Sequence, residues 1–416
     1  MHSGGPGTEP NGGPVGALFP SQSIGVPAVA NTLTNLIPEF TEALDVISRE
    51  MVGMIPAVRR DSSLERMAIG QTCYIPVTPE ASSANNTAAV TAPDTGDQTI
   101  ANTPVAITKS KHVPVRFNGE ETRGLANAGT FGSIRSQRMY QGMRTLVNEI
   151  EADLWAAAYV KASRAYGTAG TTPFGTAADM TDFAGVARIL DENGAPVSDR
   201  QLVLGHAAIG NLRGKQSGLF KVNEAGSPDM LRNGMTDRIQ NFAIRHSDAV
   251  GIHTKGAGAS GLINNGSGEA IGQTTLTFDT LTVNTTGFKA GDVVTLAADT
   301  TNKYVVNTGS TATGGDIVIG GPGLLTAIPD NNAITIGNSY TANLAFDRNA
   351  VVLVTRMPAM PEGGDAAEDV ITLVDDRSGL AFEIALYKQF LQNVYHVRLA
   401  WGCAAIKPEH IGTLLG

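Results

Sequence analysis

The chain has 416 residues, a length that fits two to three domains. Only 17% of its residues are charged, whereas Gly, Thr, Asn and Ala are abundant. Because it cannot surround itself with charge, it must bury much surface in partners or expose Thr- and Asn-rich β-structure. The net charge of −9, with no Lys or Arg before Arg49, argues against sequence-specific binding of nucleic acid.

The N-terminal region is rich in Gly, Pro, Ser and Asn and shows no helical or strand periodicity. We predict an arm over 1–35 that a neighbouring subunit must hold in place. A helix is predicted next, within the region 36–68. It has Pro38 in its first turn, carries apolar residues at spacings of three and four up to Met54, and ends at Pro56.

Residues 69–118 are predicted to form an extended β-excursion. The runs 74–77 and 113–117 have strand character, and the stretch 79–108 between them is polar. Proline within both runs restricts them to edge strands. A long two-stranded excursion is marginal in water on its own, so we expect it to lie on another molecule.

The strongest helical signal covers 133–166, where apolar residues recur at helical spacing and Gly167 stands ready to stop the helix. About 34 residues would make a rod of roughly 50 Å. Without sustained charges beside the apolar stripe, packing on the chain's own sheet is favoured over a coiled coil. Three acidic residues lie largely off the stripe: Glu149, Glu151 and Asp153.

The pattern over 177–252 is typical of α/β structure. Helices are predicted at 183–190 and 207–212, and strands at 201–204 and 238–245.

From 253 to 345 the composition changes, since Thr, Gly and Asn dominate and charges become rare. So many short strands in under a hundred residues indicate a small barrel or sandwich. Both flanks look like α/β structure, so we predict an inserted domain. Its strands are predicted at 275–278, 281–283, 293–296, 304–306, 316–319 and 333–336.

After the insert, an apolar strand is predicted at 349–355. Residues 380–386 and 394–401 each alternate apolar with other side chains, which predicts an antiparallel pair that closes the main domain. A Lys-Pro-Glu turn at 407–409 and a short apolar tail follow. The predicted fold class is α+β.

Three glycine-containing motifs resemble known sites and fail on their own chemistry. Residues 256–261 match GxGxxG, but the following Leu-Ile-Asn-Asn-Gly-Ser-Gly cannot begin the helix that would hold a pyrophosphate, so a linker is predicted. Gly205 and Gly210 have P-loop spacing without the required Lys. Ser260 misses the nucleophile-elbow spacing by one residue.

The remaining polar residues give no site either. The adjacent carboxylates Glu120-Glu121 and Asp375-Asp376 are predicted to lie in solvated turns. His246 and His253 are seven residues apart without a metal-binding context. Sequons at Asn85, Asn265 and Asn284 have meaning only in a secreted protein.

We therefore predict no catalytic, cofactor-binding or metal-binding residue, no cofactor and no enzymatic activity. Cys73 and Cys403 lack CxxC spacing, so reduced intracellular assembly is expected. The sequence shows neither the pattern of a signal peptide nor a run of about 18 apolar residues.

Three stretches resemble the coat proteins of tailed phages, specifically those of the P-twenty-two type. Residues 397–402 (VRLAWG) with 407–412 (KPEHIG) are similar to the aromatic-Gly strand and basic-Pro-Glu-x-Ile-Gly ending of that family. Residues 281–293 (LTVNTTGFKAGDV) resemble the Thr-Thr-Gly-x-basic-x-Gly-Asp segment of its insertion domain. Residues 190–196 (LDENGAP) with 200–204 (RQLVL) are similar to a turn and strand of the axial lobe.

The resemblance implies the HK-ninety-seven-like capsid fold of tailed phages and herpesviruses. It divides the chain into an N-terminal arm, a helix region, an extended β-loop, a peripheral domain with a spine helix, an axial domain in two parts around an inserted β-barrel, and a peripheral return strand. The corresponding ranges are 1–35, 36–68, 69–118, 119–176, 177–252 and 346–392, 253–345, and 393–416.

The implied function is that of a major capsid protein that self-assembles into the pentamers and hexamers of an icosahedral shell around the genome of a tailed double-stranded DNA phage. The implied location is the virion, after assembly in the host bacterial cytoplasm. The implied partners are further copies of the chain, a scaffolding protein, a portal and a decoration protein, with non-specific proximity to packaged DNA and no membrane.

One feature departs from the family, and one departs from the type member of the fold, which crosslinks itself, but agrees with the P-twenty-two branch. The insert lacks the long loop that reaches across twofold axes, because only the short segment 264–273 occupies its place. Lys109 and Lys111 lie in the predicted loop, but no motif supports self-crosslinking. A secreted, β-rich adhesin remains the alternative, since it would also explain the Thr, Asn and Gly content.

Overall fold

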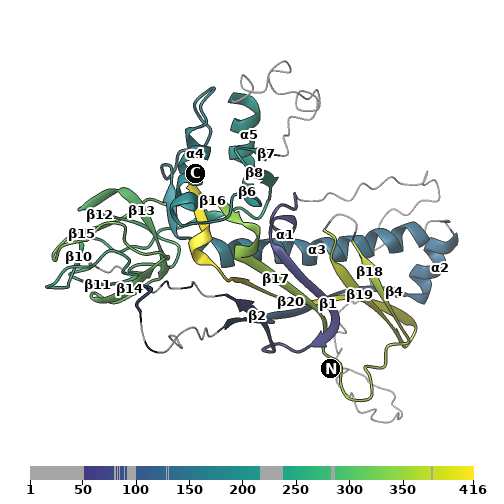
Figure 1. Ribbon diagram of the computed structural model, residues 1–416. Coiled ribbons are helices and arrows are strands. Elements are labelled where there is room, and N and C mark those ends of the chain that lie inside the picture. Colours follow the sequence, from purple (N-terminus) through teal and green to yellow (C-terminus); the bar gives the residue numbers. More distant parts are fainter. Residues whose placement is uncertain are drawn as a thin grey trace, which may run out of the picture. The chain divides into compact units, whose positions relative to one another are not determined.

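The computed structural model describes residues 51–78, 81, 83, 85–88, 90, 100–127, 129, 131–215, 238–282, 286–375 and 378–416. The predicted arm, most of the first predicted helix and part of the polar stretch 79–108 lie outside these residues. The described chain is mixed α+β and mostly strands, arranged in two large sheets and a two-stranded ribbon (Figure 1).

The first sheet is organised around the long strand β20. Strand β17 pairs with the C-terminal half of β20 and β19 with its N-terminal half, whereas β4 runs antiparallel along the opposite side. Strands β1 and β18 form the outer edge beyond β17 and β19. The predicted antiparallel pair is thus confirmed as β19 and β20. The bounds are β1 Arg59–Met67, β4 Lys109–Asn118, β17 Val351–Pro358, β18 Asp369–Val374, β19 Ala381–Gln389 and β20 Gln392–Ala405.

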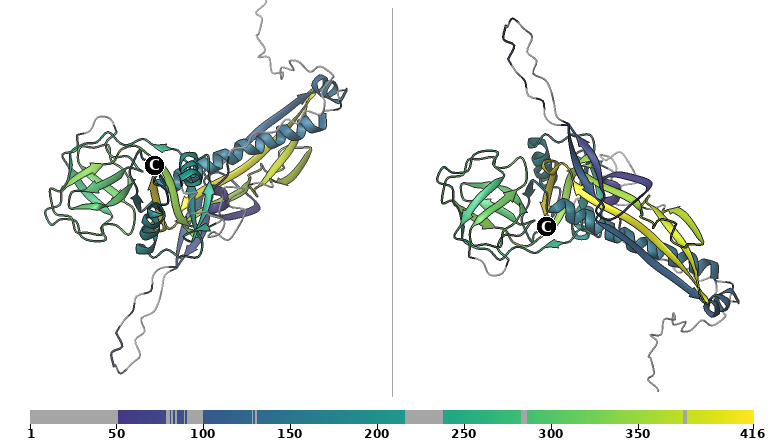
Figure 2. Two further views of the ribbon diagram at one scale, coloured as in Figure 1. Left: turned by 90° about the horizontal axis from the view of Figure 1, so that it is seen from above. Right: turned by 90° about the horizontal axis from the view of Figure 1, so that it is seen from below.

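Helix α3 (Phe131–Tyr159) lies along one face of this sheet, against β4 and β20 (Figure 2). Its apolar stripe, including Met143, Ile150 and Leu154, shares a buried core with Val397 and Trp401 of β20. The alternation of β20 is explained by this packing, since every second side chain faces the helix. The predicted rod and its packing on the chain's own sheet are confirmed. The short helix α2 (Gly119–Asn127) precedes it.

The predicted end of the rod is wrong, because α3 stops at Tyr159. The chain turns and continues as β5 (Arg164–Tyr166), which pairs with β13 (Asp299–Thr308) and β21 (Ile411–Leu415). Gly167 follows this strand with a φ of +96°, and a Cβ there would lie 3.2 Å from the Leu415 carbonyl oxygen. Strand pairing in the tertiary structure therefore overrides the local helical pattern.

The α/β lobe is built on the second sheet, in the strand order β5-β21-β16-β6-β8-β7, with β9 beside β16. Helices α4 (Thr181–Glu192) and α5 (His206–Lys215) share a core with it that includes Phe183, Leu204 and Phe242. These elements confirm the helices predicted at 183–190 and 207–212 and the strand at 201–204. The strand bounds are β6 Arg200–Leu204, β7 Arg238–Ile239, β8 Phe242–His246, β9 Ile252–His253, β16 Tyr340–Asp347 and β21 Ile411–Leu415.

Two parts of the lobe differ from prediction. The single strand predicted at 238–245 is a hairpin, because Gln240 and Asn241 have φ values of 47° and 68° and reverse the chain between β7 and β8. The Lys-Pro-Glu turn forms the short helix η3 (Pro408–His410), but the tail after it is the buried strand β21 between β16 and β5.

The predicted insert contains a closed six-stranded barrel. Its strands follow the order β12-β15-β10-β11-β14-β13, and pairing between β12 and β13 closes the ring (Figure 2). Leu276, Phe278, Val294 and Ile317 belong to its buried core. The bounds are β10 Gly261–Ile263, β11 Thr275–Asp279, β12 Val293–Leu296, β13 Asp299–Thr308, β14 Gly315–Ile319 and β15 Ala333–Ile336.

Within the barrel, the strand predicted at 281–283 is replaced. Thr282 makes only an isolated bridge with Ala259, Val283 lies outside the described residues, and β10 completes the ring instead. The short segment 264–273 is held against the barrel, where Glu269 and Ile328 form a bridge with backbone hydrogen bonds of 2.7 and 2.9 Å.

The ribbon consists of β2 (Thr72–Val77) and β3 (Ala101–Ala106), paired antiparallel. The strand predicted at 74–77 is confirmed, but its predicted partner is wrong, since 113–117 belong to β4 and pair with β20. The observed partner, β3, lies within the polar stretch 79–108, where no strand was predicted. Within the described chain β4 pairs only with β20, so it is an edge strand and tolerates Pro114 as expected.

The segment before β1 also differs from prediction. Residues 51–53 are not helical, and the one-turn helix α1 (Met54–Ala57) contains Pro56 rather than ending at it. Proline is tolerated there because the first N–H groups of a helix have no intrahelical acceptor.

Glu151 of α3 supplies the missing acceptors. Its carboxylate, on a residue only 3% exposed, accepts hydrogen bonds from the backbone N–H groups of Gly53, Met54 and Ile55 at 3.1, 2.9 and 2.6 Å. It also accepts one from the Ser247 hydroxyl at 2.6 Å. The prediction that Glu151 lies off the buried stripe is therefore wrong.

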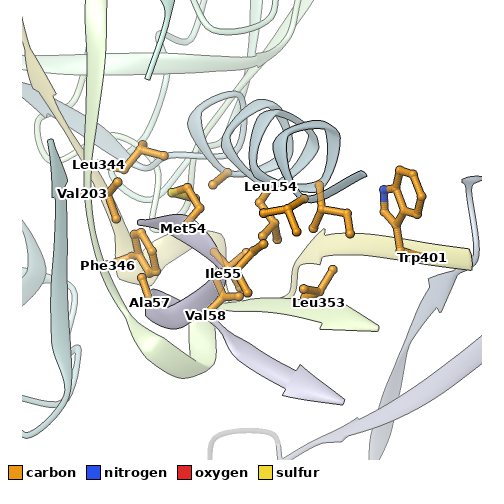
Figure 3. Packing of buried hydrophobic residues seen from close by; sticks show 14 of the residues in the cluster. Met54, Ile55, Ala57, Val58, Leu154, Val203, Leu344, Phe346, Leu353 and Trp401 are labelled. Atoms are coloured by element: carbon orange, nitrogen blue, oxygen red, sulfur yellow. The ribbon is translucent and has the colours of Figure 1, made fainter. Parts of the chain in front are cut away.

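This anchor places α1 in the main core. Met54 and Ile55 are fully buried in one cluster with Leu154 of α3, Phe346 of β16 and Leu353 of β17 (Figure 3). The cluster joins the two sheets across the helix.

The two sheets cut across the domain ranges implied by the resemblance. Strands β18 and β19, in the range assigned to the axial domain, belong to the first sheet, and β21, in the range of the peripheral return strand, belongs to the second. The naming of these ranges stays a prediction.

We expect Glu151→Gln to lower the free energy of unfolding by about 2–4 kcal/mol, because an amide offers one acceptor and turns its NH2 group toward N–H donors. Glu149→Gln is the matched control on the same helix. Glu149 is 36% exposed in its side chain and pairs with Lys111, so we expect a loss below about 1 kcal/mol. Urea unfolding measures both, and equal losses would contradict the anchor.

Candidate assembly surface

The Thr-Thr-Gly-x-Lys-x-Gly-Asp motif builds the joint between the barrel and the rest of the chain. Asp292 is fully buried, and its carboxylate contacts His253 Nε2 at 2.8 Å. It accepts hydrogen bonds from the N–H groups of Gly256 at 2.9 Å and Lys289 at 2.7 Å. The Tyr340 hydroxyl donates to the Gly291 carbonyl at 2.6 Å. The motif is therefore structural.

The glycines of the GxGxxG match serve the same joint. A Cβ on Gly256 would lie 2.2 Å from the Gly287 carbonyl oxygen, so only glycine permits the approach. The segment is packed rather than a free linker, which corrects the prediction. Strand β10 follows it in place of a helix, so the arrangement needed for a dinucleotide is not formed here.

The other two motifs that resemble coat proteins, at 190–196 and 397–412, are in contact with each other. Asn193 donates to the Glu409 carbonyl at 2.6 Å, which connects the turn at 190–196 to the Lys-Pro-Glu ending. The turn itself is held by Arg164 and Arg200, which are 2% and 3% exposed. Arg164 pairs with Glu192 at 2.5 Å, and Arg200 with Asp191 at 2.7 Å. Trp401 is buried and donates to Asp153 at 2.8 Å.

The other candidate residues also have structural settings. Glu121 lies in the first turn of α2, where it exchanges hydrogen bonds with Asn118 of 3.0 and 2.7 Å. This is a capping box. The pattern Asn-x-x-Glu at 118–121 is the sequence signal that could have predicted it. Asp375 is buried and accepts from the Ser378 N–H and hydroxyl. Both contradict the predicted solvated turns, although Asp376 lies outside the described residues.

The histidines His246 and His253 and the lysines Lys109 and Lys111 are not brought together in one site. His246 contacts His206 at 2.6 Å, whereas His253 contacts Asp292. Lys109 and Lys111 form ion pairs with Asp153 and Glu149 of α3, at 2.7 and 2.8 Å. Across the described ranges, no group of three or more His, Cys, Asp and Glu side chains is arranged to hold a metal.

The glycine and serine of the remaining motifs have ordinary roles. Gly205 donates its N–H to Asn343 at 2.9 Å just before α5, and Gly210 lies inside that helix. Ser260 is exposed with a φ of 61° before β10. Asn265 accepts from the Ser267 N–H in a turn, and Asn284 is not among the described residues. None of the helices described is long and apolar enough to cross a membrane.

Large apolar side chains are exposed on the ribbon, on the edge strand β18 and on the turn between β19 and β20. On the ribbon, Tyr74 is 67% exposed opposite Pro104, while Ile75 and Val105 on the other face are buried against β17 and β20. On the edge strand β18, Val370, Ile371 and Val374 are exposed. We call the exposed residues Tyr74, Val370, Ile371, Val374, Phe390 and Leu391 the apolar set.

The turn between β19 and β20 carries the most exposed pair of the apolar set. Phe390 is 89% and Leu391 74% exposed. Leu391 has a φ of 54°, and its carbonyl accepts from the Gly119 N–H at 3.0 Å, so the turn is fixed to the start of α2. A fixed turn that exposes two large apolar side chains to water is typical of a protein–protein interaction site.

A charge network stiffens the sheet behind this surface. Arg398 contacts Asp365 at 2.6 Å and also pairs with Glu383, which pairs with Arg66 of β1. The Tyr387 hydroxyl hydrogen-bonds to Asp365. This bond, together with Arg398, lowers the pKa of Asp365 to about 2. The network fixes the loop between β17 and β18 to β19 and β20.

No family model matches the chain, and no curated protein sequence matches it. Among solved structures, it is similar to the capsid of the cyanophage P-SCSP1u, with 13% identity over 96% of this chain and 99% of that chain and a TM-score of 0.48. It is also similar to the capsid of a native GTA particle, with 8% identity, coverage of 96% and 99%, and a TM-score of 0.45.

A structure titled Mycobacterium phage Che8 is similar as well, at 13% identity, with 92% of this chain and 98% of that chain covered and a TM-score of 0.44. All three TM-scores lie below 0.5.

We expect Gly256→Ala to destabilise the barrel joint by about 1–3 kcal/mol, since its Cβ must push the Gly287 carbonyl away. Gly266→Ala is the control, because a Cβ there meets nothing within 4 Å, and it should cost less than about 0.5 kcal/mol. Thermal unfolding compares the two variants. Equal midpoints would show that the close approach does not matter.

The Asp365 network should make stability depend on acid pH. The pKa of Asp365 is lowered in the fold from 3.8 to about 2, so its contribution is complete above pH 3.8 and is lost as the pH falls through 2. We expect on the order of 1 kcal/mol after solvent screening.

Urea unfolding of wild type and Asp365→Asn across this window tests the effect. The difference between them should shrink as the pH falls, and Tyr387→Phe should reduce it at every pH above the window. A constant difference would rule out Asp365 as the titrating group.

Proposed function

We propose that this chain is the major capsid protein of a tailed double-stranded DNA phage, with the HK-ninety-seven-like fold. In this proposal many copies assemble into pentamers and hexamers of an icosahedral shell. The motifs at 190–196, 281–293 and 397–412 support it, because their residues form the joints between the lobe, the barrel and the long sheet.

The apolar set is the observation that carries the proposal. The described chain has complete cores in both sheets and in the barrel, yet it leaves large apolar side chains exposed on the ribbon, the β18 edge and the turn at Phe390. Burying them in a partner removes roughly 25 cal/mol of unfavourable free energy per Å². A subunit of a lattice has such partners on several sides.

The parts then take capsid roles. We assign the ribbon to the extended loop that overlaps a neighbour, α3 with the first sheet to the peripheral domain, and the α/β lobe to the axial domain. Each contact can be weak because several neighbours hold every subunit at once, and closed symmetry completes the shell. Scaffolding, portal and decoration proteins belong to this proposal as expected partners, and no catalytic step does.

The alternative function, an adhesin, has less support. It rests on the Thr, Asn and Gly content of the chain. The barrel accounts for much of this content, since these residues concentrate in the range 253–345. Nothing about a small barrel requires export.

Assembly of the purified chain, with a scaffolding protein where needed, is expected to give megadalton particles in size-exclusion chromatography with light scattering. Phe390→Ser and Tyr74→Ser should reduce particle yield at least tenfold while leaving the thermal midpoint within about 2 °C, because both side chains are exposed in the subunit.

Ile271→Ser is the matched control, since Ile271 is 68% exposed on the short barrel segment. It should assemble like wild type. A chain that stays monomeric under every assembly condition would refute the capsid proposal.

A further inference from the structure

The face of the first sheet opposite α3 carries a pocket of about 280 Å³ for which the capsid proposal gives no role. It opens where β4, β20 and β19 lie side by side, next to the end of β17. Its lining is Ser110, Lys111, His112, Pro358, Tyr387, His396 and Arg398.

Several polar groups of this pocket have no hydrogen-bond partner among the described residues. They are the Ser110 hydroxyl, the imidazoles of His112 and His396, and Nη2 of Arg398, which is buried. The two imidazole rings lie 4.7 Å apart between centroids, and the Tyr387 ring meets His396 edge-on at 5.2 Å. All of these groups can act as hydrogen-bond donors.

The carboxylates near the pocket are already committed. Asp365 and Glu383 both pair with Arg398, Glu383 also pairs with Arg66, and the Tyr387 hydroxyl is used by Asp365. Lys111 is paired with Glu149 on the helix side. The fixed charges around the pocket therefore nearly cancel, and the two imidazoles are the groups whose charge can change.

We propose that this pocket binds an oxyanion, such as a carboxylate or an inorganic sulfate or phosphate, and binds it more tightly as the imidazoles take up protons. Once protonated, the imidazoles are donors only, and together with Nη2 of Arg398 they fit an anion and repel a cation. Charge-assisted hydrogen bonds from imidazolium groups would be the strong contacts. The volume is ample for one such group.

The direction of the pH effect follows from linkage. Burial, His112 and Arg398 lower the pKa of His396. Without a bound anion the neutral imidazole is therefore favoured, and the folded chain loses stability as the pH falls through the range in which histidine titrates. An anion favours the protonated form. Binding must then raise the pKa of His396, and acid pH must tighten binding.

Histidine NMR of the full-length free subunit tests this, with sodium sulfate as the probe because sulfate does not titrate in this range. Against chloride at equal ionic strength, sulfate should raise the pKa of His396 by at least about 0.5 unit. His112→Gln should abolish this shift. His410, on η3, is the control and should not respond.

An equal shift at His396 and His410 would be general salt screening and would overturn the proposal, as would no shift at either. Repeating the titration in assembled particles distinguishes two sources of the oxyanion. A pKa already raised without sulfate assigns the site to an acidic side chain of a second copy, and a retained sulfate response assigns it to a free ion. The free-subunit result stands whether or not the chain forms shells.

Discussion

A buried carboxylate must find hydrogen-bond donors, and Glu151 finds them on segments nearly a hundred residues away in the sequence. Three come from the backbone at the start of α1 and one from Ser247 after β8. Through them α3 fixes the point where the chain leads into β1. The main core can then close around Met54 and Ile55 between the two sheets. Removing the carboxylate would leave buried N–H groups without acceptors, which costs more than a lost contact on the surface.

Periodicity alone predicts the elements whose pattern reflects burial on one face. The stripe of α3 and the alternation of β19 and β20 are of this kind, as are the short strands of the barrel. Periodicity fails where residues distant in the sequence determine the local structure. Glu151 looks like a surface residue because its hydrogen-bond donors lie elsewhere in the sequence. Residues 164–166 are not helical because they pair as a strand with β13 and β21. The pairing of β2 with β3 could not be predicted, since the pattern of β3 is interrupted by Pro104 and followed by a second strand. The candidate site shares this limit. The exposure of Phe390 depends on the geometry of the turn between β19 and β20, which the sequence pattern does not predict.

The motifs that resemble coat proteins prove to be joints rather than sites. Asp292 and Gly256 connect the barrel to the lobe, Asn193 connects the turn to the Lys-Pro-Glu ending, and Trp401 connects the sheet to α3. Residues of this kind hold the barrel, the lobe and the long sheet in fixed relation. The surface that would join subunits is carried by other residues, on the ribbon and the sheet edge, where only coverage by a partner gives the exposed apolar side chains a stabilising role.

The central claim is that another copy of the chain covers the apolar set. Amide hydrogen exchange compares the same residues in free subunits and in isolated particles. The account predicts fast exchange in the ribbon strands Thr72–Val77 and Ala101–Ala106 and in β18 of the free subunit, with at least hundredfold slowing in particles. The buried strand β16, and β20, which pairs with strands on both of its sides, should change little. Equal protection of the ribbon and β18 in both states would contradict the claim.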